Sequence, residues 1–148
     1  ESEILKNRQN YYNDNEFVPV FISGKFDNYD GFQFHYKSSD KNFKIFALEG
    51  TIWTRNNFDD CKKKQKNIDK EFKVAFSNTK RSSTGIESHP EDNSGKSKYK
   101  AIFYDFKSED HISIICYDWT EKMKYPDNLR IGIMTKEFQT WINDKAYN

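Results

Sequence analysis

Six segments of the chain alternate apolar and polar residues in the manner of β-strands, and this alternation constrains the fold more than any other feature. Successive side chains of a strand point to opposite faces, so a two-residue period predicts a sheet with an apolar face. Phe32, Phe34 and Tyr36 show the pattern most clearly. The segments that we predict to be strands are 17–26, 31–37, 43–54, 99–106, 111–119 and 129–134.

Two further segments have the longer period of an amphipathic helix. Residues 59–76 place apolar side chains on one face and lysines on the other, and Asn57 or Asp59 can cap this helix. Thr135 can cap a C-terminal helix, whose buried set would be Phe138, Trp141 and Ile142. The predicted fold class is α+β, an antiparallel sheet or barrel of about six strands with one mid-chain helix and one C-terminal helix.

The length of 148 residues predicts a single domain over 1–148. Residues 1–16 are polar, and we expect them to form a loose N-terminal lead-in. Residues 77–97 are rich in Ser, Asn, Gly and charged residues and predict a mobile loop, since a loop of this length is usually functional or mobile.

The two halves of the chain resemble each other. Each has about three predicted strands followed by a helix, and the turns at 36–40 and 106–110 have similar chemistry. If the halves arose by duplication, two antiparallel three-stranded units would join into one sheet or a closed barrel with the helices packed outside. The mid-chain helix could then bring Cys61 close to Cys116.

Aromatic residues are abundant, with 13 Phe, 9 Tyr and 3 Trp. An AT-rich genome would yield much of the Phe and Tyr content, because Lys, Asn and Ile are also frequent while Gly, Ala, Arg and Pro are scarce. It does not explain the tryptophans, whose codon is GC-rich. The tryptophans therefore say more about selection for aromatic side chains than the Phe and Tyr residues do.

The charge balance argues against a nucleic-acid partner, and the distribution of apolar residues argues against a membrane-spanning segment. The net charge is +1, so no overall field attracts nucleic acid, and we expect no nucleic-acid partner. The chain contains no run of 18 apolar residues and therefore no predicted transmembrane segment.

Cys61 and Cys116 are the two cysteines, and both lie in well-patterned segments. A disulfide between them would close a loop of about 55 residues and predicts a secreted or extracellular protein. The alternative is two buried free thiols in a cytoplasmic protein. Because the sequence begins with Glu1 rather than Met, we expect a processed or trimmed product.

The segment from Tyr99 onward resembles the C-terminal part of a lipocalin. It reads as two long strands joined by an acidic turn, with Cys116 in the second strand, then a further strand and a helix. Gly24-Lys25-Phe26 is similar to the opening Gly-x-Trp of that family, with Phe in place of Trp, and Thr135-Lys136 stands where an arginine is usual. The resemblance implies a calycin-like barrel.

Catalytic and cofactor motifs are absent from the sequence, so we expect a non-enzymatic protein without a cofactor or bound metal. We predict a pocket or contact surface for a small apolar ligand or a protein partner, formed by Trp53, Tyr117, Trp119 and Tyr36. One alternative is an intracellular effector or inhibitor that docks on a target protein through 77–97. A less favoured alternative is a hydrolase that uses Asp118, an acid in an apolar strand.

Overall fold

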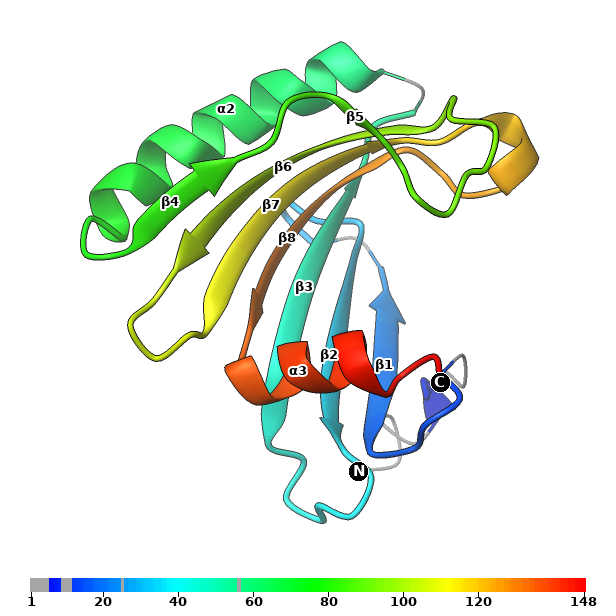
Figure 1. Ribbon diagram of the computed structural model, residues 1–148, viewed down its shortest axis with the longest axis vertical. Coiled ribbons are helices and arrows are strands. Elements are labelled where there is room, and N and C mark those ends of the chain that lie inside the picture. Colours follow the sequence, from blue (N-terminus) through cyan, green and yellow to red (C-terminus); the bar gives the residue numbers. More distant parts are fainter. Residues whose placement is uncertain (1–5, 9–11, 25, 56) are drawn as a thin grey trace.

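The chain forms one antiparallel sheet flanked by helices, as described by a computed structural model for residues 6–8, 12–24, 26–55 and 57–148 (Figure 1). The α+β prediction is confirmed, with eight strands instead of about six. The additional strands, β4 and β5, lie within 77–97. The elements are β1 (Phe17–Ser23), β2 (Gly31–Lys37), β3 (Ile45–Trp53), α2 (Phe58–Ala75), β4 (Lys80–Ser83), β5 (Glu87–Ser88), β6 (Lys98–Asp105), β7 (His111–Asp118), the 3-10 helix η1 (Glu121–Met123), β8 (Asn128–Met134) and α3 (Lys136–Asp144).

The strand order is β1-β2-β3-β8-β7-β6-β4, and β5 also pairs with β6. Two consecutive-strand units, β1-β2-β3 and β6-β7-β8, therefore join where β3 pairs with β8. Across the described residues the sheet is open, with β1 and β4 at its edges. Pro19 suits the edge strand β1 because proline has no N–H to donate to a neighbouring strand. Of the predicted lead-in, residues 1–5 and 9–11 lie outside the described part.

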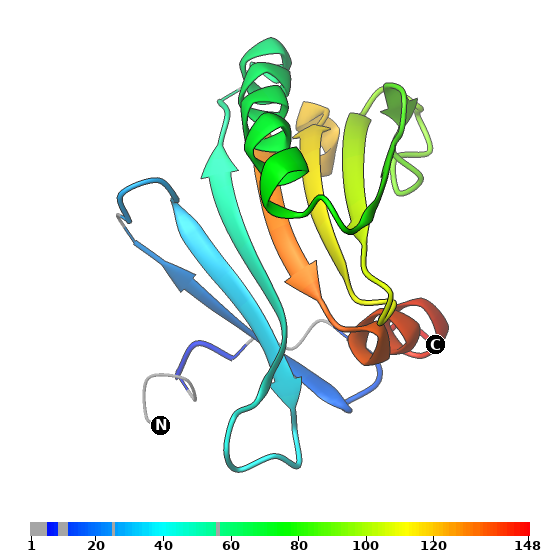
Figure 2. The ribbon, with the colours of Figure 1, turned by 90° about the vertical axis from the view of Figure 1, so that its left-hand side faces the viewer.

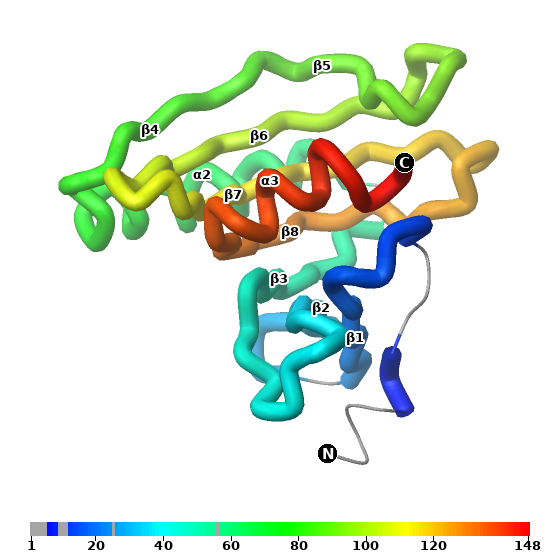
Figure 3. The backbone as a smooth tube through the Cα atoms, turned by 60° about the horizontal axis from the view of Figure 1, so that its bottom comes forward, coloured from blue at the N-terminus to red at the C-terminus, as the bar shows by residue number. Residues whose placement is uncertain are grey.

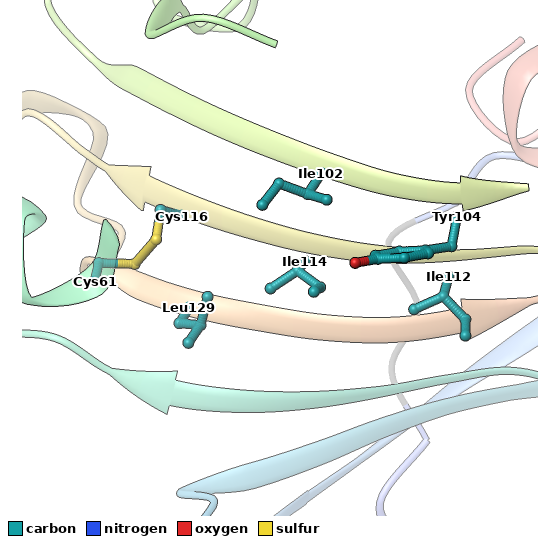
Figure 4. Packing of buried hydrophobic residues seen from close by; sticks show 7 residues of the cluster. All are labelled: Cys61, Ile102, Tyr104, Ile112, Ile114, Cys116 and Leu129. Atoms are coloured by element: carbon teal, nitrogen blue, oxygen red, sulfur yellow. A yellow bond between two sulfur atoms is a disulfide. The ribbon is translucent and has the colours of Figure 1, made fainter. Parts of the chain in front are cut away.

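Helix α2 covers one face of the sheet at β6, β7 and β8 (Figure 2). Its apolar side packs on a buried cluster that consists of Cys61, Ile102, Tyr104, Ile112, Ile114, Cys116 and Leu129 (Figure 4). Gln65 is buried in the same interface, and its amide nitrogen donates to the carbonyl oxygens of Lys100 and Ile114 at 2.8 and 2.7 Å. Because a buried amide needs partners, these hydrogen bonds help to fix the helix on the sheet.

A disulfide joins Cys61 in the first turns of α2 to Cys116 in β7, with Cα atoms 5.8 Å apart (Figure 4). The predicted pairing is confirmed. Both residues are completely buried in the cluster under α2. The bond therefore attaches the N-terminal end of the helix to a strand in the interior of the sheet.

Helix α3 packs on the opposite face, near β1 and β3. Its side chains enter a second buried cluster, which contains Phe17, Phe46, Ala47, Phe138, Trp141 and Ala146. Thr135 caps the helix by accepting from the backbone nitrogen of Phe138 at 3.2 Å. The indole nitrogen of Trp141 donates to Asp14 Oδ1 at 2.7 Å, which lowers the pKa of Asp14 and attaches the N-terminal segment to the helix.

Strand β4 is held by an ion pair that crosses from the strand to α2. Arg81 donates from Nε and Nη2 to the two carboxylate oxygens of Asp69 at 2.7 and 3.0 Å, and the Tyr104 hydroxyl donates to the same carboxylate at 2.6 Å. Burial disfavours the charged form of Asp69, but the hydrogen bonds from Arg81, Tyr104 and Lys73 outweigh it and lower its pKa to about 2. Arg81 thus fixes a strand whose four residues are otherwise exposed.

The described part of the chain contains no helix that is both long enough and apolar enough to cross a lipid bilayer.

Replacement of Asp69 with alanine should destabilise the fold by about 3 kcal/mol, because it leaves Arg81 without its carboxylate and removes the shorter of the two hydrogen bonds of the buried Tyr104 hydroxyl, which keeps the backbone carbonyl of residue 69. The free energy of unfolding from urea denaturation measures the effect. Glu71→Ala, on the exposed side of the same helix, is the matched control and should change stability by less than about 0.5 kcal/mol. Equal effects of the two substitutions would contradict the assigned role of Asp69.

Removal of the disulfide should lower the free energy of unfolding by about 4 kcal/mol, because the bond closes a long loop in the unfolded chain. The comparison is between the oxidised protein and a Cys61→Ala/Cys116→Ala double variant. A reductant should lower the melting temperature of the natural sequence and leave that of the double variant unchanged. A reductant effect on both proteins would show that the change is unrelated to this bond.

Candidate ligand-binding site

A cavity of about 600 Å³ opens on the face of the sheet that carries α3. Its floor comes from β2, β3, β7 and β8, and its sides come from the segments that follow β5 and β7 and from both terminal segments. Figure 3 shows α3 crossing this part of the sheet while β4 and β5 run beside β6. The lining residues are Tyr12, Gln33, Glu49, His89, Glu91, Tyr117, Trp119, Tyr125, Arg130, Ile142 and Tyr147.

Strand register brings two opposite charges together on the floor. In the β3–β8 pair, Glu49 lies opposite Gly132 and Thr51 lies opposite Arg130. Glu49 and Arg130 therefore share the face opposite to that of Leu129, which packs under α2. A Cβ atom at position 132 would lie 2.8 Å from Cγ of Glu49, so the glycine leaves the space that the Glu49 side chain occupies.

One side of the cavity is a group of rings that we call the aromatic wall, formed by His89, Tyr117, Trp119 and Tyr125. The rings of Tyr117 and Trp119 are stacked, with centroids 5.5 Å apart and an angle of 9° between their planes. Tyr125 meets Trp119 edge-on at 5.0 Å, and His89 lies 4.3 Å from Trp119 on centroids. The wall therefore offers several ring surfaces to the cavity from one strand and two loops.

Two buried aspartates hold the loops that carry the wall. Asp92 accepts from the backbone nitrogens and hydroxyls of Ser94 and Ser97 at 2.6–2.9 Å, and these hydrogen bonds lower its pKa. Asp127 accepts from the backbone nitrogen of Trp119 at 2.7 Å. The positions of the wall residues are thus set by local hydrogen bonds as well as by ring contacts.

Two nitrogen donors of the cavity, Arg130 Nε and Trp119 Nε1, are buried and have no hydrogen-bond acceptor among the described residues. The guanidinium carbon of Arg130 lies 5.4 Å from the ring centroid of Tyr117. Its Nη1 is 3.9 Å from Glu49 Oε2, which is too far for a hydrogen bond. Burial raises the pKa of Glu49, and the nearby charge of Arg130 opposes this shift.

The two terminal segments meet at the other side of the cavity. The ring of Tyr12 packs edge-on against Trp141 at 4.9 Å and against Tyr147 at 5.5 Å. Its hydroxyl is 3.0 Å from Nε2 of His35, which is buried beneath it in β2. Burial lowers the pKa of His35 to about 4, so the imidazole is neutral at physiological pH.

The structure brings together two of the four residues predicted to contact a ligand. Tyr117 and Trp119 are stacked neighbours in the cavity. Trp53 ends β3 with 36% of its surface exposed and is not among the lining residues. Tyr36 is completely buried in a separate core cluster, where its hydroxyl accepts from Nε of Arg8 at 2.6 Å.

Most of the lining residues were not predicted from the sequence as ligand contacts, and those that matter most for the site are Glu49, Arg130, His89 and Tyr125. The sequence offered one indication of Glu49 and Arg130: each is a charged residue within a strand of alternating apolar residues, at a position where burial is expected. His89 and Tyr125 lie in loops, where no periodicity indicates the direction of a side chain.

Asp118 lines a second cavity of about 740 Å³, together with Ser94, Lys96, Trp119, Thr120, Glu121, Lys122, Tyr125 and Asp127. Burial and the nearby Asp127 raise the pKa of Asp118. Within the described ranges, no group of three or more His, Cys, Asp or Glu side chains is arranged to hold a metal ion. A docking role for 77–97 stays a prediction.

Comparison of the chain with protein-family models, curated proteins and solved structures gives no significant match. The resemblance of the C-terminal third to lipocalins therefore stays a prediction.

The buried neutral His35 should make stability depend on pH. Its folded pKa lies below the unfolded value of 6.5, so its contribution is complete above that pH and is lost as the pH falls toward 4. Between about pH 7.5 and 5, the advantage of the natural protein over His35→Gln should shrink by about 2 kcal/mol. Urea denaturation at both pH values measures the free energy of unfolding of the two proteins. A difference between them that does not change with pH would contradict the prediction.

Proposed function

We propose that the cavity binds a small, flat and largely apolar molecule, and that the protein is a non-enzymatic binding protein that works outside the cytosol. The observation that carries this proposal is the aromatic wall, above all the parallel rings of Tyr117 and Trp119 beside an open cavity. Aromatic side chains supply a large contact area at a small cost in conformational entropy, and their faces match flat ligands.

The size and lining of the cavity support a small ligand. Its volume of about 600 Å³ lies within the range typical of small-molecule sites. Such sites are mostly apolar with a few polar groups that orient the ligand. Here the rings and Ile142 would provide the apolar contacts, while Gln33, Arg130 and the indole nitrogen of Trp119 would provide the polar ones.

A location outside the cytosol is supported by the buried disulfide between Cys61 and Cys116. Disulfides form and persist in oxidising compartments and are rare in the reducing cytosol. The same bond weighs against an intracellular effector.

The acid on which a hydrolase would rely does not belong to the proposed binding site and lines the second cavity instead. Asp118 follows Tyr117 in β7, and neighbouring residues of a strand point to opposite faces. Asp118 therefore faces away from the cavity to which Tyr117 contributes its ring.

Fluorescence titration with prodan, a neutral naphthalene dye, tests the proposal. We expect a blue shift of the dye emission on binding. Trp119→Ala should weaken binding about tenfold, because it removes the ring at the centre of the wall. Trp53→Ala is the matched control, since it removes the same side chain outside the cavity, and its dissociation constant should stay within about twofold.

Circular dichroism spectra establish that both variants are folded before the comparison. Absence of any dye binding, or equal losses in the two variants, would contradict the proposed site.

A further inference from the structure

We infer that the ligand of this cavity is an organic anion, a flat apolar molecule whose carboxylate binds Arg130. This inference rests on the proposed function and deepens it by assigning the charge of the ligand.

Arg130 is positioned to bind an acceptor from outside the chain. Its guanidinium group lies over the Tyr117 ring, and Nε is buried without an acceptor among the described residues. A buried donor without a partner destabilises a protein, and a ligand acceptor would satisfy it. The planar fork of a guanidinium matches the two oxygens of a carboxylate. An acidic group at this point would thus bring the apolar remainder of the ligand beside Tyr117 and Trp119.

The charges around Arg130 leave it available to an anion. Oε2 of Glu49 is 3.9 Å from Nη1 of Arg130, beyond hydrogen-bond distance, so Glu49 does not occupy the donors of the guanidinium group. Glu91, the other carboxyl group of the lining, belongs to an exposed residue where water screens its charge. Burial lowers the pKa of His89 in the aromatic wall; the charge of Glu91 opposes this shift, and the charge of Arg130 adds to it.

The indole nitrogen of Trp119 is the second buried donor of the lining that has no acceptor among the residues that the structure describes. In the described part of the lining, the two buried polar atoms without a partner are N–H donors, so a ligand with acceptor atoms would suit them better than one with donors. A flat acid with a further carbonyl or hydroxyl oxygen would satisfy both.

The test compares three naphthalene probes of the same shape by isothermal titration calorimetry: 2-naphthoate, 2-naphthylmethanol and 2-naphthylmethylammonium. We expect the naphthoate to bind at least about tenfold more tightly than the alcohol, because a charge-assisted hydrogen bond is stronger than a neutral one. The ammonium should bind more weakly than the alcohol. Tighter binding of the ammonium, or equal affinities of all three, would overturn the inference while the proposed function stands. If none binds, both fail.

Two variants assign the preference to Arg130. Arg130→Gln should remove the preference for the naphthoate, whereas Lys122→Gln, which removes one positive charge from the neighbouring cavity, should retain it. Glu49→Gln keeps Arg130 and removes the competing carboxyl, so it should bind the naphthoate at least as tightly as the natural protein. Loss of naphthoate binding in Glu49→Gln, or an unchanged preference in Arg130→Gln, would overturn the inference.

Discussion

The pairing of β3 with β8 is the contact on which the rest of the structure depends. It joins the unit β1-β2-β3 to the unit β6-β7-β8, and without it the chain would have two small sheets rather than one. The same pairing sets Glu49 beside Gly132 and brings its carboxyl near Arg130. A shift of one residue in this register would place Glu49 and Arg130 on opposite faces of the sheet, because strand side chains alternate between faces.

The two faces of the joined sheet have different roles. Helix α2 covers one face through the buried cluster, and the disulfide and Gln65 fix it there. On the other face, α3 covers the sheet near β1 and β3, and the cavity lies between α3 and the aromatic wall. Rings thus fill the core near α3 and line the cavity beside it, which explains why the aromatic content of the chain does not by itself locate a site.

The sequence was sufficient for the features that depend on local pattern. Alternation predicted six of the strands, the apolar face of residues 59–76 predicted α2, and Thr135 predicted the start of α3. It did not predict β4, which contains no apolar residue and is held by the ion pair of Arg81 with Asp69 in a distant element. Tyr36 and Tyr117 both lie in alternating strands, and only the assembled sheet places one in the core and the other in the cavity. Arg130 and Glu49 became neighbours only through the register of strands far apart in the chain.

The central claim is that the cavity beside Trp119 is a ligand site. A correlation spectrum of the ¹⁵N-labelled protein contains one indole N–H signal for each of the three tryptophans, and Trp119 is the one of the three that lines the cavity. During titration with 2-naphthoate, the signal of Trp119 should shift progressively to saturation while those of Trp53 and Trp141 remain in place. A stationary Trp119 signal, with shifts at Trp53 or at neither residue, would contradict the account.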